Sequence, residues 1–338
     1  MEWSPSHVMT VQDEIVKIFN GSYTQALKNA YWDKLVVEKP SRARVEYFES
    51  SLSTAKVEDL PEGQMLYGDL ATVSQPAKPR PRGQGLQLSE LDVLNDKLGV
   101  VAQWAAEMGS AIALEPQYML LDLYAKSETV KAYDGIAYHG TAHPVNPKSP
   151  ALGTYDSLIT TVSQVSAAAI ANTSATPATT DACDLRGYNG VPNLAVFAAV
   201  VAYVRKLLAP NGRSRNLKPS ILVHGPNLTF TARTITGAQF ISATVNAVAQ
   251  ITGEFTDYNI VPLEIPEITD NSWGLVTSVE GVDLKPVIHT TRAPYRLTAY
   301  TPEMLVDLSR KAMLEWNVRG YADAVFYNPF QWIKVKVA

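Results

Sequence analysis

Two histidines placed four residues apart, His139 and His143, are the first candidates for chemistry in this sequence. On one turn of a helix, that spacing would let both imidazoles bind the same metal ion. Gly140 lies between them and Pro144 follows, so the segment is predicted to be a loop, and the glutamate that a zinc protease requires is missing from it. We therefore expect no metal site here, but a loop held by side-chain hydrogen bonds.

An acid upstream of these histidines leaves one enzymatic alternative open. Asp134 could act with His139 and His143 in a soluble α/β hydrolase. The sequence contains neither the G-x-S-x-G motif of many hydrolases nor a phosphate-binding loop. We therefore keep a hydrolase only as a second alternative.

The remaining reactive side chains do not form a recognisable site. Glu264, Glu267 and Asp270 are spaced like paired acids for proton transfer, but they alternate with proline and isoleucine near the end of an expected strand, which is typical of a solvated edge. Cys183 stands among aspartates, whose charge disfavours the thiolate that a nucleophile needs. Gly83 begins a glycine pattern of the dinucleotide-binding type, yet leucine fills the third glycine position and no strand–helix–strand unit surrounds it. We expect no catalytic residue, no cofactor and no metal.

A basic strip is the clearest candidate for a contact with a partner. Lys78, Arg80 and Arg82 alternate with prolines, which makes a stiff, positively charged segment. Two interpretations remain open, a solvated linker or a docking strip for an acidic neighbour, and these three residues are the candidate subunit-contact residues. Removal of Pro76 to Arg82 is expected to leave the subunit folded and to weaken assembly. Three charges are too few to indicate specific binding of nucleic acid.

The composition narrows the class of protein. The chain has 338 residues, 46% of them hydrophobic, which is ample for a sizeable core. Its net charge is −4 and its pI is about 5.8, so no global basic field for nucleic acid exists. A single cysteine excludes an internal disulfide and favours a reducing cytosol. No apolar run approaches the roughly 20 residues that span a bilayer, and Met1 to Thr10 lack the order of a signal peptide, so we expect no membrane partner.

A long amphipathic helical region, Leu91 to Ser127, is expected to organise the fold. Apolar residues recur there at steps of three and four, which places them on one helix face. They are Leu94, Leu98, Val101, Ala105, Met108 and Ile112. Pro116 should end this helix and open a second one over Gln117 to Lys126. Upstream, Val11 to Ala30 is predicted to be a short amphipathic arm that breaks at Gly21.

The other segments predict a mixture of helices and strands. Ser41 to Glu90 holds three short strand patterns with too few large apolar residues to fold alone, so it should lie against a neighbouring surface. Further helices are expected over Leu158–Ala171, Leu194–Leu208, Pro226–Ala238, Phe240–Ile251 and Thr301–Gly320, and strands over Ile260–Ile265, Trp273–Val279, Pro286–His289 and Tyr295–Tyr300. The chain should close on a half-exposed strand, Trp332 to Val337, with its lysines on the open face. The fold class is therefore α+β.

Several short motifs, taken in their order, resemble the Mu-like phage major head subunit (gpT-type) family. They are Leu94-Asn95-Asp96-Lys97-Leu98-Gly99, Glu107-Met108-Gly109-Ser110-Ala111, Glu115-Pro116, Tyr133-Asp134-Gly135 and Ala142-His143-Pro144-Val145-Asn146-Pro147. The resemblance covers Leu86 to about Gly153 best, and the last hundred residues agree only in the order of elements. The Ser41 to Glu90 segment, with its basic strip, departs from the family pattern.

This resemblance implies the Hong Kong 97 capsid fold. That fold has an N-terminal arm, an extended β-loop, a peripheral domain with a long spine helix, and an axial domain. On this plan, residues 1–40 would be the arm, 41–90 the extended loop, 91–128 the spine helix of the peripheral domain, 129–286 mainly the axial domain, and 287–338 the return to the peripheral domain.

The resemblance also implies a structural function rather than an enzymatic one. The chain would be the major head protein of a tailed bacteriophage or prophage, assembling as hexamers and pentamers into an icosahedral shell that encloses double-stranded DNA. Implied partners are copies of itself, a separate scaffold protein, a portal, a decoration protein in some shells, and DNA contacted non-specifically. Its expected location is the virion, after assembly in the host bacterial cytoplasm. The first alternative is the shell of an encapsulin-like nanocompartment or of a gene-transfer particle.

Overall fold

The computed structural model divides into two compact units. The described residues are 5–51, 72–89, 98–165, 183–186, 192–237, 240–242, 250–252, 259–278, 285–298 and 313–337. Unit 1 comprises Met1–Tyr47, Pro76–Tyr124 and Val287–Val325, and unit 2 comprises Phe48–Gln75, Ala125–Pro286 and Phe326–Ala338. Residues 287–325 thus belong to unit 1 and residues 326–338 to unit 2. Parts of the expected elements, over 52–71, 91–97, 166–171 and 301–312, lie outside the described residues.

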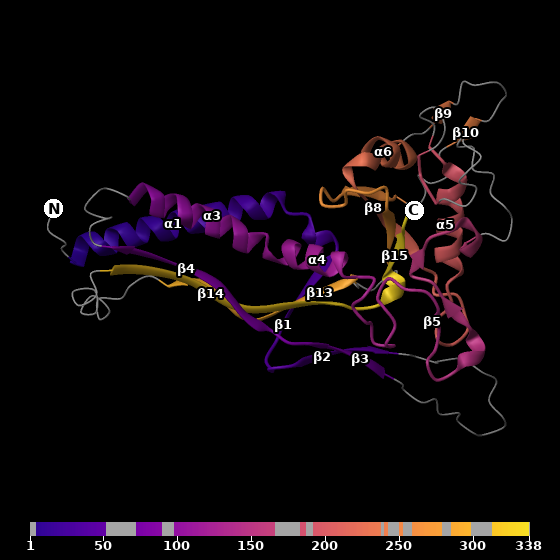
Figure 1. Cartoon of the computed structure of the whole chain (residues 1–338), viewed down its shortest axis with the longest axis horizontal. Helices are drawn as coiled ribbons and strands as arrows, with labels where there is room; N and C mark the ends of the chain where they lie inside the picture. Colours follow the sequence, from indigo (N-terminus) through magenta and orange to yellow (C-terminus); the bar gives the residue numbers. More distant parts are fainter. Residues whose placement is uncertain are drawn as a thin grey trace, which may run out of the picture. The chain divides into compact units, whose positions relative to one another are not determined.

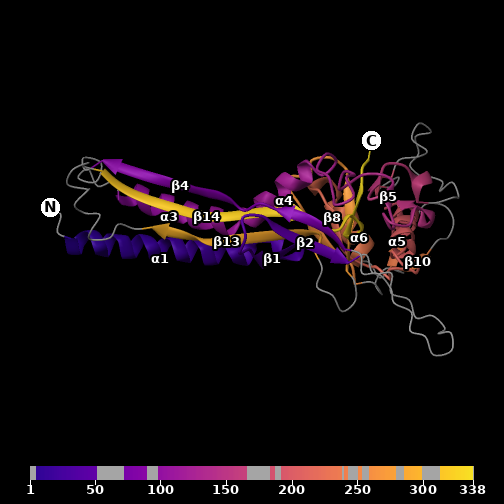
Figure 2. The same ribbon diagram turned by 90° about the horizontal axis from the view of Figure 1, so that it is seen from below.

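Two helices pack along each other in unit 1. α1 (Pro5–Asn29) and α3 (Leu98–Ala113) lie side by side in both views (Figures 1 and 2), and α4 (Glu115–Ala125) follows after the break predicted at Pro116. The expected break of the first helix at Gly21 is wrong, because α1 continues through it. A glycine inside a helix costs only about 1 kcal/mol relative to alanine, which packing against α3 offsets.

The core of unit 1 joins these helices to a sheet. One cluster of buried residues in this core consists of Ile15, Phe19, Val101, Ala105, Trp316 and Val318. Gly109 permits the close approach of the two helices, because a Cβ there would stand 2.4 Å from the carbonyl oxygen of Phe19. The helical face predicted from the spacing of apolar residues therefore does face the core at Val101 and Ala105.

The sheet of unit 1 has four strands in the order β1-β13-β14-β4. They are β1 (Val36–Pro40), β13 (Val287–Thr298), β14 (Met313–Phe326) and β4 (Arg80–Ser89). β1 runs parallel to β13, and β4 runs antiparallel to β14. The two strands expected over 286–300 are thus one long strand.

The C-terminal helix expected to end at Gly320 is wrong over the residues that the structure describes. Residues 313–320 belong to β14. Trp316, Val318 and Gly320 are buried while Asn317 and Arg319 are exposed, which is the period of two of a strand. The spacing that placed Trp316 on a helix face matched a helix only by chance.

The sheet of unit 2 has five strands in the order β11-β8-β12-β15-β7. They are β11 (Val261–Glu264), β8 (Lys218–His224), β12 (Trp273–Ser278), β15 (Trp332–Val335) and β7 (Leu158–Ile159). β12 runs antiparallel to β8 and β15, whereas β11 is parallel to β8 and β7 is parallel to β15.

The sequence predicted a half-exposed closing strand, and this prediction is wrong for β15. β15 has a neighbour on each side, and all four of its residues are buried. Lys334 is only 8% exposed, and its Nζ lies 2.8 Å from Glu128 Oε1, while Lys336 Nζ lies 2.8 Å from Glu128 Oε2. The carboxylate of Glu128 is therefore what allows a lysine to be buried in this strand.

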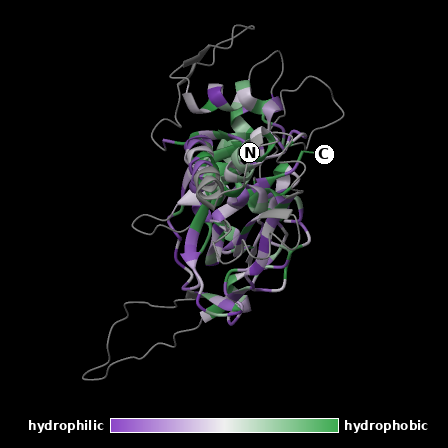
Figure 3. Ribbon diagram, turned by 90° about the vertical axis from the view of Figure 1, so that its left-hand side faces the viewer, coloured by the Kyte–Doolittle hydropathy of each residue, from purple (hydrophilic) through white to green (hydrophobic). Residues whose placement is uncertain are grey.

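Two helices accompany this sheet. α5 (Leu194–Lys206) begins as predicted after Asn193, whose side chain accepts a hydrogen bond from the N–H of Val196. α6 (Thr229–Gly237) follows a 3₁₀ turn at Pro226–Leu228, close to the predicted range. These described helices and strands carry hydrophobic and hydrophilic residues side by side (Figure 3), as expected of elements that bury one face.

Two expected helices of unit 2 are replaced by other structure. Residues 158–165 form β7 and a 3₁₀ turn at Val162–Gln164. At the two described ends of the second expected helix, β9 (Phe240–Ser242) pairs antiparallel with β10 (Gln250–Thr252); residues 243–249 lie outside the described residues. Helix propensity in such stretches is only a weak preference, which tertiary context overrides.

Two small two-stranded sheets complete the described structure. β2 (Glu46–Ser51) lies beside β3 (Thr72–Ala77), and β5 (His143–Pro144) pairs antiparallel with β6 (Thr154–Tyr155). No helix within the described ranges is long and apolar enough to cross a membrane.

Candidate functional site

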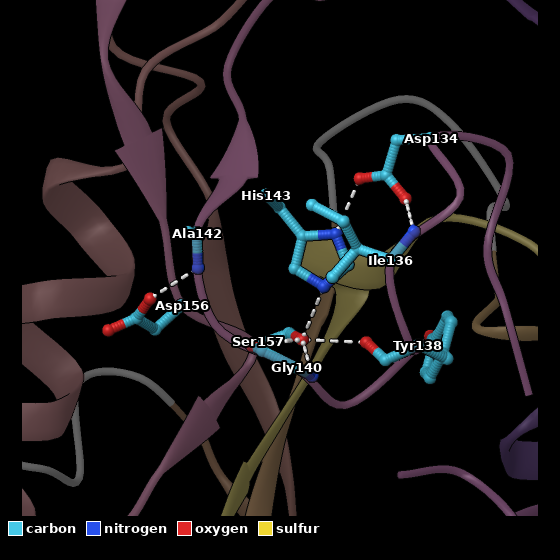
Figure 4. Close-up of polar contacts among 8 residues, drawn as sticks. All are labelled: Asp134, Ile136, Tyr138, Gly140, Ala142, His143, Asp156 and Ser157. Carbon is cyan, nitrogen blue, oxygen red and sulfur yellow. Dashed lines mark hydrogen bonds and ion pairs between the residues drawn. The ribbon is translucent and has the colours of Figure 1, made fainter. Parts of the chain in front are cut away.

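Three polar side chains of unit 2 meet in the order of a hydrolase triad (Figure 4). The Nδ1 atom of His143 lies 2.6 Å from Asp134 Oδ2, and its Nε2 atom lies 3.0 Å from Ser157 Oγ. His143 begins β5, Ser157 follows β6, and Asp134 lies in the turn before them. The sequence named Asp134 and His143, and the structure brings them together. It missed Ser157, which lies in none of the motifs that mark a nucleophile.

The hydroxyl of Ser157 is fully engaged inside the protein. Its Oγ lies 2.6 Å from the carbonyl oxygen of Tyr138 and 3.1 Å from that of Gly140, and it accepts the N–H of Gly140 at 2.9 Å. Ser157 and His143 are both 0% exposed. A nucleophile must reach its substrate, so a triad enclosed in this way serves as a latch between loops.

Asp134 completes the latch. Its other oxygen, Oδ1, accepts the N–H of Ile136 at 3.1 Å, and its side chain is 1% exposed. The predicted loop held by side-chain hydrogen bonds is therefore confirmed. The latch ties the turn at residues 134–136 to β5 and to the segment before β7.

His139 does not share this environment. Its ring packs edge-on against Trp332, with 5.5 Å between ring centroids, and near Phe326 at 6.1 Å. Burial lowers the pKa of His139 well below its ordinary value, and the charge of Lys334 lowers it further, so the imidazole is neutral. The two histidines thus have separate surroundings, and within the described part of the chain no three metal-binding side chains come together.

The acids singled out in the sequence make local contacts. Glu264 Oε2 accepts the hydroxyl of Thr229 at 2.8 Å, and Asp270 accepts the N–H and the hydroxyl of Ser272 at 3.1 and 2.7 Å. Glu264, Glu267 and Asp270 are all exposed, so the solvated edge is confirmed.

Cys183 and Gly83, the remaining candidates from the sequence, have roles in packing and strand pairing. Cys183 is fully buried, and its carbonyl oxygen accepts the indole N–H of Trp273 at 2.9 Å. Gly83 lies in the middle of β4, where a Cβ would stand 2.0 Å from the carbonyl oxygen of Val318 in β14. This glycine serves close strand pairing, because it lies in a ladder and not in a phosphate-binding loop.

The basic strip lies in the sheet of unit 1, which contradicts the solvated-linker interpretation. Arg80 begins β4 and is paired with Ala322 of β14, and Lys78 donates its N–H to Asp323 Oδ2 at 2.7 Å. Ala77 is fully buried. Removal of residues 76–82 would therefore disturb the sheet itself, and assembly would not be the only property affected.

The side chains of the strip nevertheless face outward. Lys78, Arg80 and Arg82 are all exposed. Arg82 Nε lies 3.5 Å from Glu115 Oε1, so only a loose ion pair holds it. The structure thus presents a rigid row of cations.

Comparison with known proteins places this architecture. Residues 12–171 match the family model described as the Mu-like prophage major head subunit gpT. The capsid of bacteriophage JBD30 is similar at a TM-score of 0.51 and 17% identity, over 70% of this chain and 90% of that one. The same capsid decorated with minor capsid protein trimers gives a TM-score of 0.53 at 17% identity, over 71% and 91%.

A second phage gives the same result. Mycobacterium phage Patience is similar at a TM-score of 0.51 and 13% identity, over 95% of this chain and 86% of that one. No curated protein matches the chain in sequence. The fold is that of phage major capsid proteins, the Hong Kong 97 type, as the resemblance implied.

Proposed function

We infer that this chain is a major head subunit of the Mu-like family, the major capsid protein of a tailed bacteriophage or prophage. The match of residues 12–171 to that family carries the inference, and the capsid fold supports it. The chain assembles with copies of itself, as hexamers and pentamers of an icosahedral shell. It is found in the virion, after assembly in the bacterial cytoplasm.

The two units support an assignment of the capsid domains. Unit 1 corresponds to the peripheral domain, with α3 and α4 as the spine helix of residues 91–128 and residues 1–40 as the arm. Unit 2 corresponds to the axial domain of residues 129–286, joined by the last strand, β15. Within the proposed extended loop, 41–90, β4 belongs to the sheet of unit 1, whereas β2 and β3 form a separate two-stranded sheet.

The shell interpretation also favours further partners. A separate scaffold protein directs assembly, a portal occupies one vertex, and a decoration protein binds the shell; the capsid of JBD30 is decorated with minor capsid protein trimers. The net charge of −4 suits a wall that contacts double-stranded DNA non-specifically, because it does not hold the genome tightly. The chain is not an enzyme: the buried latch at Ser157 argues against the hydrolase alternative.

Imaging of the purified protein tests this function. The full chain, expressed in bacteria, should elute from a sizing column as capsomers or very large particles, and negative-stain images should show hollow shells. A well-folded protein that elutes only as a monomer or small oligomer at every concentration and salt would contradict the proposal. Particles that contain a protein cargo in place of DNA would favour the nanocompartment, and heterogeneous host DNA would favour the gene-transfer particle.

A further inference from the structure

Unit 1 contains a pocket of about 420 Å³ that the functions discussed above do not use. Its walls come from α1, from the break between α3 and α4, and from β13. Tyr23, Trp32 and Tyr295 supply aromatic surface. The Trp32 ring is fixed, because its Nε1 donates to the carbonyl oxygen of Ala113 at 3.2 Å. The pocket is therefore a built feature of the unit.

Charged groups form one side of this pocket. His289 of β13 is paired in register with Glu38 of β1, and its Nδ1 lies 3.5 Å from Glu38 Oε1. Its Nε2 lies 3.5 Å from Oε2 of Glu115, the first residue of α4. Burial lowers the pKa of His289, but the hydrogen-bonding influence of Glu115 and Glu38 outweighs it and leaves that pKa above its ordinary value. Two carboxylates thus face one imidazole and favour its protonated form.

The polar capacity of this wall is not used up within the described residues. His289 is only 3% exposed, yet neither nitrogen of its imidazole has a hydrogen bond of ordinary length. The same holds for both carboxylate oxygens of Glu115 and for the hydroxyl of Tyr295. Arg82 reaches Glu115 only at 3.5 Å, longer than the 2.7–2.9 Å typical of a charge-assisted bond. Buried polar groups generally have partners, so this pocket is suited to a polar guest.

The lining selects the chemical class of that guest. Carboxylates favour a cation that donates hydrogen bonds, and aromatic faces favour a cation with an apolar stem. A lysine or arginine side chain has both features. The carboxylate of Glu38 is accessible from outside, since its side chain is 59% exposed.

The same chain presents such side chains on a rigid support. Lys78 and Arg80 are exposed where β3 passes into β4, between prolines, and the N–H bond from Lys78 to Asp323 fixes the backbone. Within the described residues, neither side chain forms an ion pair. Two different surfaces that fit each other produce a head-to-tail contact, which closes into rings when copies repeat.

We propose that the pocket formed by Glu38, Glu115 and His289 in one copy receives the Arg80 side chain of a neighbouring copy, with Lys78 beside it. The proposal rests on the shell function inferred above. It gives the exposed basic strip an acidic neighbour, and that neighbour is the same protein. The contact adds a charged, orienting element to subunit association, which sets register and specificity more than affinity.

Charge exchange between the two surfaces tests the contact. Arg80→Glu and Glu38→Lys, each alone, should lower the yield of particles about tenfold or more, because each places like charges together. Arg44→Glu is the matched control, since Arg44 is also exposed in unit 1, and it should assemble as the wild type does. Thermal unfolding, measured in parallel, should stay close to the wild-type midpoint for Arg80→Glu and Arg44→Glu. Glu38→Lys should have a lower midpoint, because His289 loses a carboxylate partner, but it should remain folded at the assembly temperature.

Co-assembly separates a contact between copies from one within a chain. When Arg80→Glu subunits are mixed with Glu38→Lys subunits, the introduced carboxylate of one copy meets the introduced ammonium group of the next, so particles should return. If each variant is folded but the mixture stays unassembled, or if Arg80→Glu alone assembles normally, the proposal is wrong. Failure of the proposed function differs from both, because the wild type itself would then form no particles.

Discussion

Replacement of Ser157 by alanine removes one hydroxyl from the interior of unit 2, and no other group takes its place. The hydroxyl serves the carbonyl oxygen of Tyr138 at 2.6 Å, the N–H of Gly140 at 2.9 Å and Nε2 of His143 at 3.0 Å. Ser157, His143 and Tyr138 are 0% exposed, so bulk water does not reach these residues to replace the lost partner. Each buried polar group left without a hydrogen bond costs about 1–3 kcal/mol. We expect Ser157→Ala to lower the free energy of unfolding by about 3 kcal/mol.

Urea denaturation of the unassembled subunit, followed by circular dichroism, measures this loss. Ser163→Ala is the matched control: its hydroxyl lies 3.0 Å from Thr161 Oγ1 at an exposed position, so the midpoint should shift little. An unchanged midpoint for Ser157→Ala would refute the latch. An esterase activity in the wild type that Ser157→Ala abolishes would support the hydrolase instead.

Other perturbations test the packing and the ion pairs. Gly109→Ala should lower the free energy of unfolding by about 1–3 kcal/mol, because a Cβ there stands 2.4 Å from a backbone oxygen of α1. Gly99→Ala is the control and should raise this free energy slightly, because a Cβ at that position has nothing within 4 Å. Thermal unfolding of the two variants side by side measures both effects. Glu128→Gln should cost about 1–2 kcal/mol in urea titrations, because the 8% exposed Lys334 loses its charged partner; a lysine that found another partner would show no change. Because the pKa of His289 is raised in the folded state, protonation of His289 stabilises the fold fully below the unfolded pKa of about 6.5, and this contribution is lost as the pH rises through the folded pKa. The thermal midpoint should therefore fall between about pH 6 and 8.5, and His289→Gln should remove this fall. An equally steep pH dependence of the midpoint in His289→Gln would contradict the prediction.

The parts that sequence could predict were those governed by local rules. The break at Pro116 follows from the missing backbone donor, and α5 follows from its apolar period and from the cap at Asn193. The helical face with Val101 and Ala105 does reach the core. Short motifs in order were enough to suggest the fold that the solved phage capsids share.

The parts that sequence could not predict depend on partners distant in the chain. Lys334 resembled a residue on an open face because its partner, Glu128, lies 206 residues away. Ser157 lies in no nucleophile motif, and only the fold brings it to His143. The spacing that includes Trp316 also fits a helix, and pairing with β4 decides in favour of a strand. In each case a tertiary contact decides the outcome, which no local pattern encodes.

The interior position of β15 sets the order in which this protein can mature on the ribosome. The strand lies between β12 and β7, and its own sequence begins only at Trp332. When β7, β8, β11 and β12 have been synthesised, the strand that joins β12 to β7 is still missing. The edges of β12 and β7 that pair with β15 therefore have no partner in this sheet until β15 is made. Unit 2 therefore becomes complete only after synthesis has passed Val335, so prematurely terminated chains lack a finished unit to contribute to a particle.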